Sequence, residues 1–260
     1  MAAGNPGKIG PSGGPIPRRW DTETPRQFPA SNEGPPRRRA ALALSLGVIV
    51  LAWAYQIATQ RSGATLPAHF SELAFRIARN KLIVFGVLFL LLRLEGEGFE
   101  ALGVSRRDWV RRLAAGLAIG LAMFIGLNVA LDSLLNAVFP RNAASGPSVM
   151  AFFKEPLNLL VWLPIGILGG GVVEELQRIF VITRFEKWLG RPGLVLGVAL
   201  SSAIFGFGHL YQGLGTALST AVSGLVFCLV YLRRRSALEP IAAHAFSDVL
   251  AMLGATLLAP

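Results

Sequence analysis

The chain has 260 residues, of which 53% are hydrophobic and 15% charged, and its mean hydropathy is +0.53. These values lie outside the range of ordinary soluble domains and indicate a polytopic membrane protein. The formal net charge is +10, but the basic residues form short clusters between apolar runs, as topology signals do, so we expect no nucleic-acid partner.

Residues 1–39 are rich in Pro, Gly and Arg and contain no apolar run that could form the core of a secretory signal. Their apolar content is too low to offset the entropy of ordering, so we expect a disordered, basic, cytoplasmic tail. Residues 40–260 are expected to form one transmembrane helical domain. The single cysteine, Cys228, excludes an internal disulfide framework.

Apolar segments of membrane-crossing length recur along the rest of the chain. Crossing about 30 Å of hydrocarbon at about 1.5 Å per residue takes roughly 20 residues. The candidate segments are 40–58, 80–94, 113–138, 157–183, 194–212, 214–232 and 237–258. The second is short, and charged residues interrupt the fourth. We therefore predict an all-α fold, a polytopic transmembrane bundle of about seven helices.

Basic clusters indicate the orientation. They fall at 37–39, 106–112, 184–191 and 233–235, in alternate connections, which the positive-inside rule assigns to the cytoplasm. The first connection is also basic, where "LPAHFSELAFRIARN" has the pattern of an amphipathic interfacial helix. We expect an integral protein of the bacterial inner membrane, in contact with the lipid bilayer, with its N-terminus in the cytoplasm.

Few ionisable side chains fall inside the predicted spans. Each costs about 2.5–3.5 kcal/mol to insert, so such residues usually face a cavity or a partner. They include Glu174, Glu175, Arg178, His209, His244 and Asp248. A polar stripe in the third segment either joins neighbouring helices or lines the same cavity, and consists of Asn128, Asp132 and Asn136.

The spacing of these groups permits a single site between helices. Glu174 and His244 lie roughly 14–15 Å along the helix from the nearest basic cluster, and His209 about 25 Å, a difference that helix tilt can absorb. Glu174 and Glu175 lie about 100° apart on a helix. One of them can face a cavity while Arg178 pairs with either.

A buried carboxylate and nearby imidazoles can activate water. A desolvated carboxylate is a usable general base near neutral pH, and an imidazole can position water or donate to an oxyanion. Glutamate with two histidines is also a ligand set for catalytic zinc, here Glu174, His209 and His244. The residues leave both chemistries open.

Three motifs carry a family resemblance. They are "EELQR" with Glu174, Glu175 and Arg178, "FGFGH" from Phe205 to His209, and "HAFSD" from His244 to Asp248. Together they resemble the CPBP family of intramembrane proteases, which includes type II CAAX prenyl endopeptidases, bacteriocin-processing relatives and abortive-infection proteins. The resemblance covers about residues 150–258. The family pattern is Glu-Glu-x-x-x-Arg, whereas Arg178 comes one residue early and Ile179 occupies the expected place.

The resemblance implies an intramembrane endopeptidase that cleaves a membrane-associated protein or peptide, with the motifs in 169–250 of a protease-like domain. It implies that Glu174 activates water with His209. It also implies that His244 and Asp248 hold the water or stabilise the oxyanion. The supporting residues are Glu175, Arg178 and Phe205. The family is called a metalloprotease, yet a metal-free mechanism has also been argued for it, so zinc stays open.

Other functions fit parts of the pattern. A rhomboid-like serine protease would use Ser223 of "AVSG" as nucleophile and His244 as base, but Ala221 stands where glycine is expected and the paired glutamates have no role. A proton-coupled carrier would use the Glu and His residues as a relay. A non-proteolytic membrane protein of the same fold is the remaining alternative. Proteolysis best explains the second glutamate.

Overall fold

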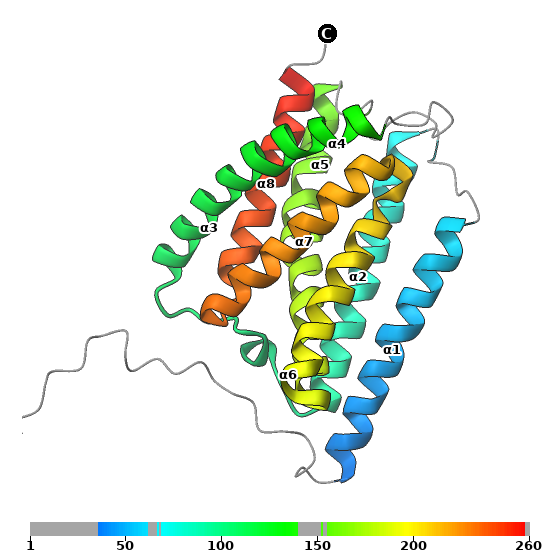
Figure 1. Ribbon diagram of the computed structural model, residues 1–260, viewed down its shortest axis with the longest axis vertical. Helices are drawn as coiled ribbons and strands as arrows, with labels where there is room; N and C mark the ends of the chain where they lie inside the picture. The colour runs from blue at the N-terminus through cyan, green and yellow to red at the C-terminus, as the bar shows by residue number, and fades with distance from the viewer. Residues whose placement is uncertain (1–35, 62–66, 68, 140–151, 153–154, 258–260) are drawn as a thin grey trace, which may run out of the picture.

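The structure is a computed structural model that describes residues 36–61, 67, 69–139, 152 and 155–257. Within those ranges every regular element is helical and no strand is found, so the predicted all-α bundle is confirmed (Figure 1). Most of the predicted tail lies outside the described residues. Residues 36–39 are the exception, because the first helix begins at Pro36.

Helices occupy both halves of the chain. In the first half they are α1 (Pro36–Arg61), α2 (Phe70–Leu94), α3 (Trp109–Met123), the π-helical η3 (Phe124–Leu131) and α4 (Asp132–Val138), with the short η2 (Phe99–Leu102) before α3. In the second half they are η6 (Pro156–Asn158), α5 (Leu159–Pro164), the π-helical η7 (Ile165–Glu174), α6 (Glu175–Gly208), η8 (Leu210–Gln212), α7 (Leu214–Arg234) and α8 (Leu238–Leu257).

The helix α6 consists of two arms that meet at Gly190. This glycine has φ 64° and ψ −141°, a backbone conformation that other residues rarely adopt. The second arm returns beside the first, since the bare backbone of Gly197 lies against Ile182 and Phe185. The continuous segment Leu159–Gly208 has 50 residues, far more than one crossing needs. The fourth and fifth predicted segments therefore correspond to two helical arms that meet at the non-helical Gly190.

Membrane-crossing length and composition are met by five helical stretches among the described residues, one of which is the two-armed segment. The helix α2 is longer than the predicted segment 80–94, because residues 70–79, predicted as interfacial, continue the same helix. The predicted end of the fifth segment at 212 is wrong. The helix α6 stops at Gly208, and His209 follows in a turn.

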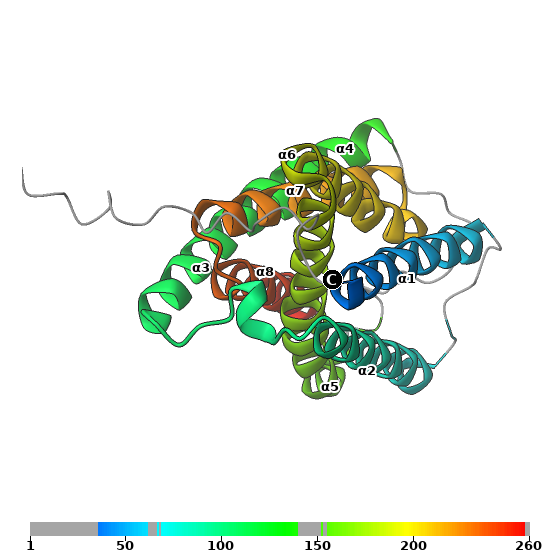
Figure 2. The same cartoon turned by 90° about the horizontal axis from the view of Figure 1, so that it is seen from below.

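The first arm of α6 forms the centre of the bundle. In Figure 2 the α5–α6 stretch lies between α1 and α2 on one side and α3 and α8 on the other. Ile179, Phe180 and Ile182 are almost completely buried there. The helix α3 approaches α8 closely, because Gly116 and Gly120 present no side chain to it. Both the first arm of α6 and the helix α8 carry motif residues.

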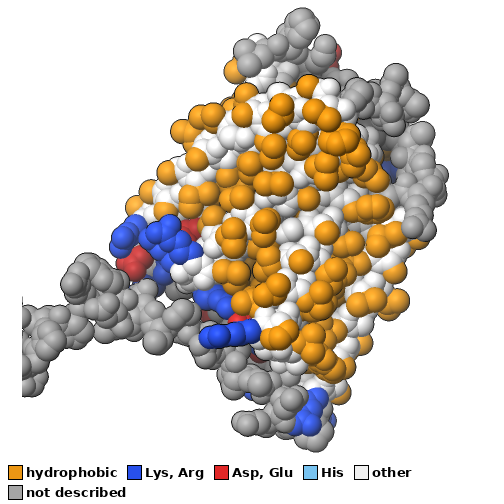
Figure 3. Space-filling view, in the orientation of Figure 1, with side chains coloured by type: hydrophobic (Ala, Val, Ile, Leu, Met, Phe, Trp, Pro, Cys, Tyr) orange, Lys and Arg blue, Asp and Glu red, His pale blue; other side chains and the backbone are white. Residues whose placement is uncertain are grey.

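Basic residues gather at one end of the bundle (Figure 3). Buried Arg184 pairs with Glu95 at 2.9 Å and with Glu97 at 3.0 Å, and the Ser45 hydroxyl donates to Glu95 at 2.6 Å. These contacts join α1, the connection after α2, and α6. Burial acts to raise the pKa of the Glu97 carboxyl, but the charges of Arg184 and Lys187 outweigh it and hold that pKa below its ordinary value.

The polar stripe of the third predicted segment contacts neighbouring helices. The side-chain amide of Asn128 donates to the Ser247 hydroxyl of α8 at 3.3 Å. The amide of Asn136 donates to the Thr216 hydroxyl of α7 at 3.3 Å and to the Asp132 carbonyl at 2.8 Å. These contacts favour the interhelical interpretation of the stripe, because such hydrogen bonds hold membrane helices together.

Candidate active site

The paired glutamates stand at a change of helical geometry. Glu174 is the last residue of the π-helical η7, and Glu175 is the first residue of α6. Pro164 immediately precedes η7. Proline removes a backbone donor, and π-helical segments within α-helices often occur at functional sites. The local widening of the helix therefore places two adjacent carboxylates where the hydrogen-bond register changes.

Three consecutive glycines of η7 each face a different partner. A Cβ atom on Gly169 would lie 3.1 Å from the side chain of Lys81 in α2. One on Gly170 would lie 2.5 Å from a carboxylate oxygen of Asp248 in α8. The glycine run thus lets α2 and α8 approach the segment that ends at Glu174.

The third glycine yields a test of this packing. A Cβ atom on Gly171 would lie 2.6 Å from the Ala245 Cβ, so Gly171→Ala is expected to destabilise the fold by about 1–3 kcal/mol through overpacking. The matched control is Gly86→Ala in α2, where a Cβ atom meets no neighbour within 4 Å. Thermal unfolding in detergent measures both. Equal melting temperatures for the two variants would contradict the close approach of η7 and α8.

Around these glycines a cluster of polar and aromatic side chains forms what we call the Glu/His site. It consists of Lys81, Glu174, Glu175, Arg178, Phe205, His209, His244 and Asp248. The structure thus brings together all seven residues that the sequence predicted and adds Lys81. They come from α2, η7, both arms of α6 or its end, and α8.

Glu175 is the buried anchor of the Glu/His site. Its side chain is 0% exposed, and it accepts hydrogen bonds from Arg178 Nε at 3.1 and 3.2 Å. It also accepts one from His244 Nδ1 at 2.7 Å. A carboxylate that bonds one imidazole nitrogen fixes the orientation of the ring. Glu175 therefore links α6 to α8 and aims the other nitrogen of His244.

That other nitrogen faces the remaining carboxylates. His244 Nε2 lies 3.6 Å from an oxygen of Asp248 and 3.9 Å from an oxygen of Glu174. The ring also stacks on Phe227, with 4.6 Å between centroids. In the imidazolium form, each N–H of His244 would face a carboxylate. Such a cation would balance the three carboxylates together with Lys81 and Arg178.

Phe205 connects the buried arginine to both histidines. The guanidinium carbon of Arg178 lies 4.1 Å from the Phe205 ring centroid, a cation–π contact. The same ring meets His209 edge-on at 5.0 Å and His244 at 5.8 Å. His209 Nδ1 donates to the Phe205 carbonyl at 2.9 Å, which leaves Nε2 of its ring for other partners.

Lys81 is the residue of the Glu/His site that sequence reasoning missed. Its ammonium donates to the Glu174 carboxylate from α2. The position of Lys81 in the sequence could have indicated its role. Lys81 lies inside the predicted span 80–94, directly before the apolar run "LIVFGVLF".

Exposure divides the Glu/His site into a buried and an open part. The side chains of Glu175, Arg178 and His244 are 0%, 4% and 7% exposed. Those of Glu174, Lys81 and Asp248 are 22%, 26% and 30% exposed. A reactant can therefore reach Glu174 and Asp248, whereas Glu175 is closed off by the groups that it binds.

The donors do not fit a zinc site. Zinc needs nitrogen and oxygen ligands at about 2.0–2.2 Å in a tetrahedral arrangement. Across the described part of the chain, no group of three or more His, Cys, Asp or Glu side chains is arranged to hold a metal ion. One oxygen of Glu174 is moreover paired with the Lys81 ammonium. The described arrangement of Glu174, His209 and His244 therefore gives no support to the predicted zinc site.

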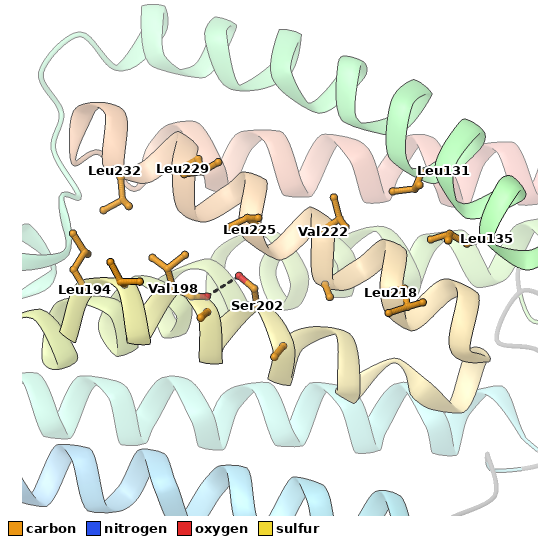
Figure 4. A pocket seen from close by; sticks show the side chains of 14 residues that line it. Leu131, Leu135, Leu194, Val198, Ser202, Leu218, Val222, Leu225, Leu229 and Leu232 are labelled. Atoms are coloured by element: carbon orange, nitrogen blue, oxygen red, sulfur yellow. Dashed lines mark hydrogen bonds between the residues drawn. The ribbon is translucent and has the colours of Figure 1, made fainter. Parts of the chain in front are cut away.

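The structure also contains an apolar groove of about 800 Å³, away from the Glu/His site. Its walls come from the second arm of α6, from α7, and from η3 and α4, and the labelled residues of Figure 4 are nearly all leucine and valine. Ser202 is the polar residue among them, and its hydroxyl donates to the Val198 carbonyl at 2.8 Å. No residue of the Glu/His site lines this groove, so the polar cluster and not the groove is the candidate active site.

The serine-protease alternative lacks its catalytic contact. The Ser223 hydroxyl donates to the Ser219 carbonyl of its own helix at 3.1 Å. The nitrogens of His244 face carboxylates, as described above. A serine nucleophile needs a base within hydrogen-bond reach of its hydroxyl. The geometry therefore favours the glutamate over Ser223.

Fold and site define an integral membrane helical protein with a buried Glu/His site on converging helices. Residues 156–250 match the family model described as "Type II CAAX prenyl endopeptidase Rce1-like". This match confirms the resemblance that the three motifs indicated, and it spans all of them. The searches of curated proteins and of solved structures gave no match. The family is one of membrane-embedded proteases, which implies a peptide substrate and a lipid bilayer.

Proposed function

We propose that the chain is an intramembrane endopeptidase that hydrolyses a peptide bond of a membrane-associated protein or peptide with water activated at Glu174. The observation that carries this proposal is the difference between the paired glutamates. Glu175 is closed off by Arg178 and His244, whereas the Glu174 side chain is 22% exposed and has one carboxylate oxygen 3.9 Å from His244 Nε2. A general base needs that access, because it must reach the proton that it removes.

In the proposed reaction, Glu174 accepts a proton from water while the water oxygen attacks the peptide carbonyl carbon. The carbonyl oxygen becomes an oxyanion, and the carbon–nitrogen bond then breaks. Glu174 returns the proton to the leaving amine. One water is consumed, and a carboxylic acid and an amine are released. No metal takes part in these steps.

The histidines hold the reactants in this scheme. His209 is restrained through Nδ1 by the Phe205 carbonyl, so its Nε2 can orient the water. His244 is restrained through Nδ1 by Glu175, and in its imidazolium form Nε2–H can donate to the oxyanion. Asp248 lies 3.6 Å from Nε2 of His244 and helps to align the imidazole ring. Preorganised donors of this kind act without rearrangement during the reaction.

We also propose that the basic end of the bundle faces the cytoplasm. The ion pairs of Arg184 and Arg235 place the clusters 184–191 and 233–235 at the same end as the connection after α2. A common side for these clusters is what the positive-inside rule requires. It puts the N-terminus of α1 in the cytoplasm, since Arg38 acts electrostatically on Glu97 at this end.

Reconstituted cleavage tests the proposed function. The wild type in lipid vesicles is expected to cut membrane peptides from a library, and Ser223→Ala is expected to cut them at an unchanged rate. Chelation of divalent metals is expected to leave the rate within about twofold, because no donor set among the described residues is arranged to hold a metal. Loss of cleavage after chelation, restored by added zinc, would contradict the metal-free reaction. Loss in Ser223→Ala would instead establish the serine protease, and proton flux without cleavage would establish a carrier.

A further inference from the structure

We infer that Lys81 is a positioning residue of the proposed reaction, which holds one oxygen of Glu174 and leaves the other as the base. This inference rests on the proposed function and extends it to α2, outside the segment 156–250 that matches the family. Lys81 donates to Oε1 of Glu174. The second oxygen, Oε2, is the one that lies 3.9 Å from His244 Nε2.

The surroundings of Lys81 are shaped for this contact. Its aliphatic stem runs over Gly169, where an added Cβ atom would lie 3.1 Å from Cγ and 3.6 Å from Cε. Gly169 precedes Glu174 by five residues in η7, and five residues bring two positions to nearly the same face of a π-helix. The bare backbone of Gly169 therefore lets the stem lie flat and guides the ammonium to Glu174.

Among the charged groups around Glu174, the Lys81 ammonium makes direct contact with the Glu174 carboxylate. Lys81 faces it from α2, His244 and Asp248 from α8, and His209 from the end of α6. Arg178 is committed to Glu175, to which it donates from Nε. Among the lysine and arginine side chains of the described residues, Lys81 is thus the one that contacts the proposed base.

The role has a consequence for the pH dependence of cleavage. A carboxylate beside a fixed cation keeps its charge to lower pH than the same carboxylate without one. When the cation is removed, Glu174 becomes protonated at higher pH and stops acting as a base there. The acid limb of the rate profile therefore moves to higher pH. A residue needed only for folding would lower the amount of active protein without moving this limb.

The first experiment compares pH–rate profiles of the reconstituted wild type, Lys81→Met, Lys81→Arg and Arg79→Met. Arg79 is exposed on the same helix, so Arg79→Met removes one charge without touching Glu174. Lys81→Met is expected to shift the acid limb of kcat upward by about one pH unit or more, with KM changed less than kcat. Lys81→Arg is expected to restore much of the profile. A Lys81→Met profile that coincides with that of Arg79→Met overturns the inference.

A second experiment tests the contact without relying on activity. The membrane-permeant reagent dicyclohexylcarbodiimide joins a carboxylate to an adjacent amine as an amide, and mass spectrometry identifies the linked peptides. A link between Lys81 and Glu174 is expected in the wild type and is expected to be absent in Glu174→Gln. Failure to form it in folded wild type overturns the inference. If the wild type cuts no peptide, the proposed function fails, and this link alone decides whether Lys81 holds Glu174.

Discussion

Glu174→Gln is expected to lower the cleavage rate by about 10²–10⁴-fold, the usual contribution of a general base, while the protein remains folded. The amide has nearly the same shape as the carboxylate but cannot accept the proton of the attacking water. The loss should appear in kcat, with little change in KM, because Glu174 acts on the water and not on substrate binding. Initial rates in the reconstituted assay measure both constants.

The melting temperature of the variant is its control. Glu174 is partly exposed and pairs with Lys81, so its neutralisation should cost far less stability than neutralising a fully buried charge. A Glu174→Gln variant that melts normally and cuts at the wild-type rate would refute its role as the base. The other accessible carboxylate, Asp248, would then be the next residue to test.

Glu175→Leu is expected to lower the free energy of unfolding by about 3–5 kcal/mol, because it leaves the Arg178 charge buried without its partner. It also removes the acceptor that orients His244, so activity should be lost in whatever protein still folds. Chemical or thermal unfolding in detergent measures the first effect. The cleavage assay measures the second.

The double variant Glu175→Leu with Arg178→Met separates these two effects. Replacing both members of a buried ion pair by apolar residues is often neutral or stabilising, so the fold should recover most of its stability. Cleavage should stay lost, because His244 still lacks its anchor. Recovered activity in this double variant would show that Glu175 serves the fold alone. An unstable double variant would show that the ion pair is not the main contribution of Glu175.

The motifs allowed much of the Glu/His site to be predicted. Each motif holds its residues at helical spacing, so His244 and Asp248 had to share a face, and an apolar environment required partners for both glutamates. The resemblance assigned the water to Glu174, but spacing alone could not separate the two glutamates, because a turn of about 100° leaves either one free to face Arg178. In the structure Glu175 binds Arg178, and the packing of α8 brings His244 to the same carboxylate.

Lys81 and the depth of His209 show where sequence reasoning stops. The contact of Lys81 with Glu174 joins residues that lie far apart in the chain, and no local period encodes it. The count along the helix placed His209 deeper than Glu174 and His244, whereas in the structure the Phe205 ring contacts both His209 and His244. The position of each residue in the site depends on how the helices pack against one another. The glycines that permit the close approach of α2 and α8 have no reactive side chain of their own.

The helix pattern was predictable for a related reason. Apolar length is a local property, so the segments could be read along the chain. The π-helical geometry of η7 is different, because it arises where Pro164 and the glycine run meet the packing of α8. The structure shows both the changed hydrogen-bond register and the partners of the glycines.

The measurement that tests the central claim most directly is a comparison of peptide termini in membrane fractions from cells that contain the wild type or Glu174→Gln. If Glu174 activates the water, specific membrane proteins will carry new termini with the wild type and will remain as uncut precursors with Glu174→Gln. Identical termini in the two samples, with both proteins folded and present in equal amounts, would contradict the account.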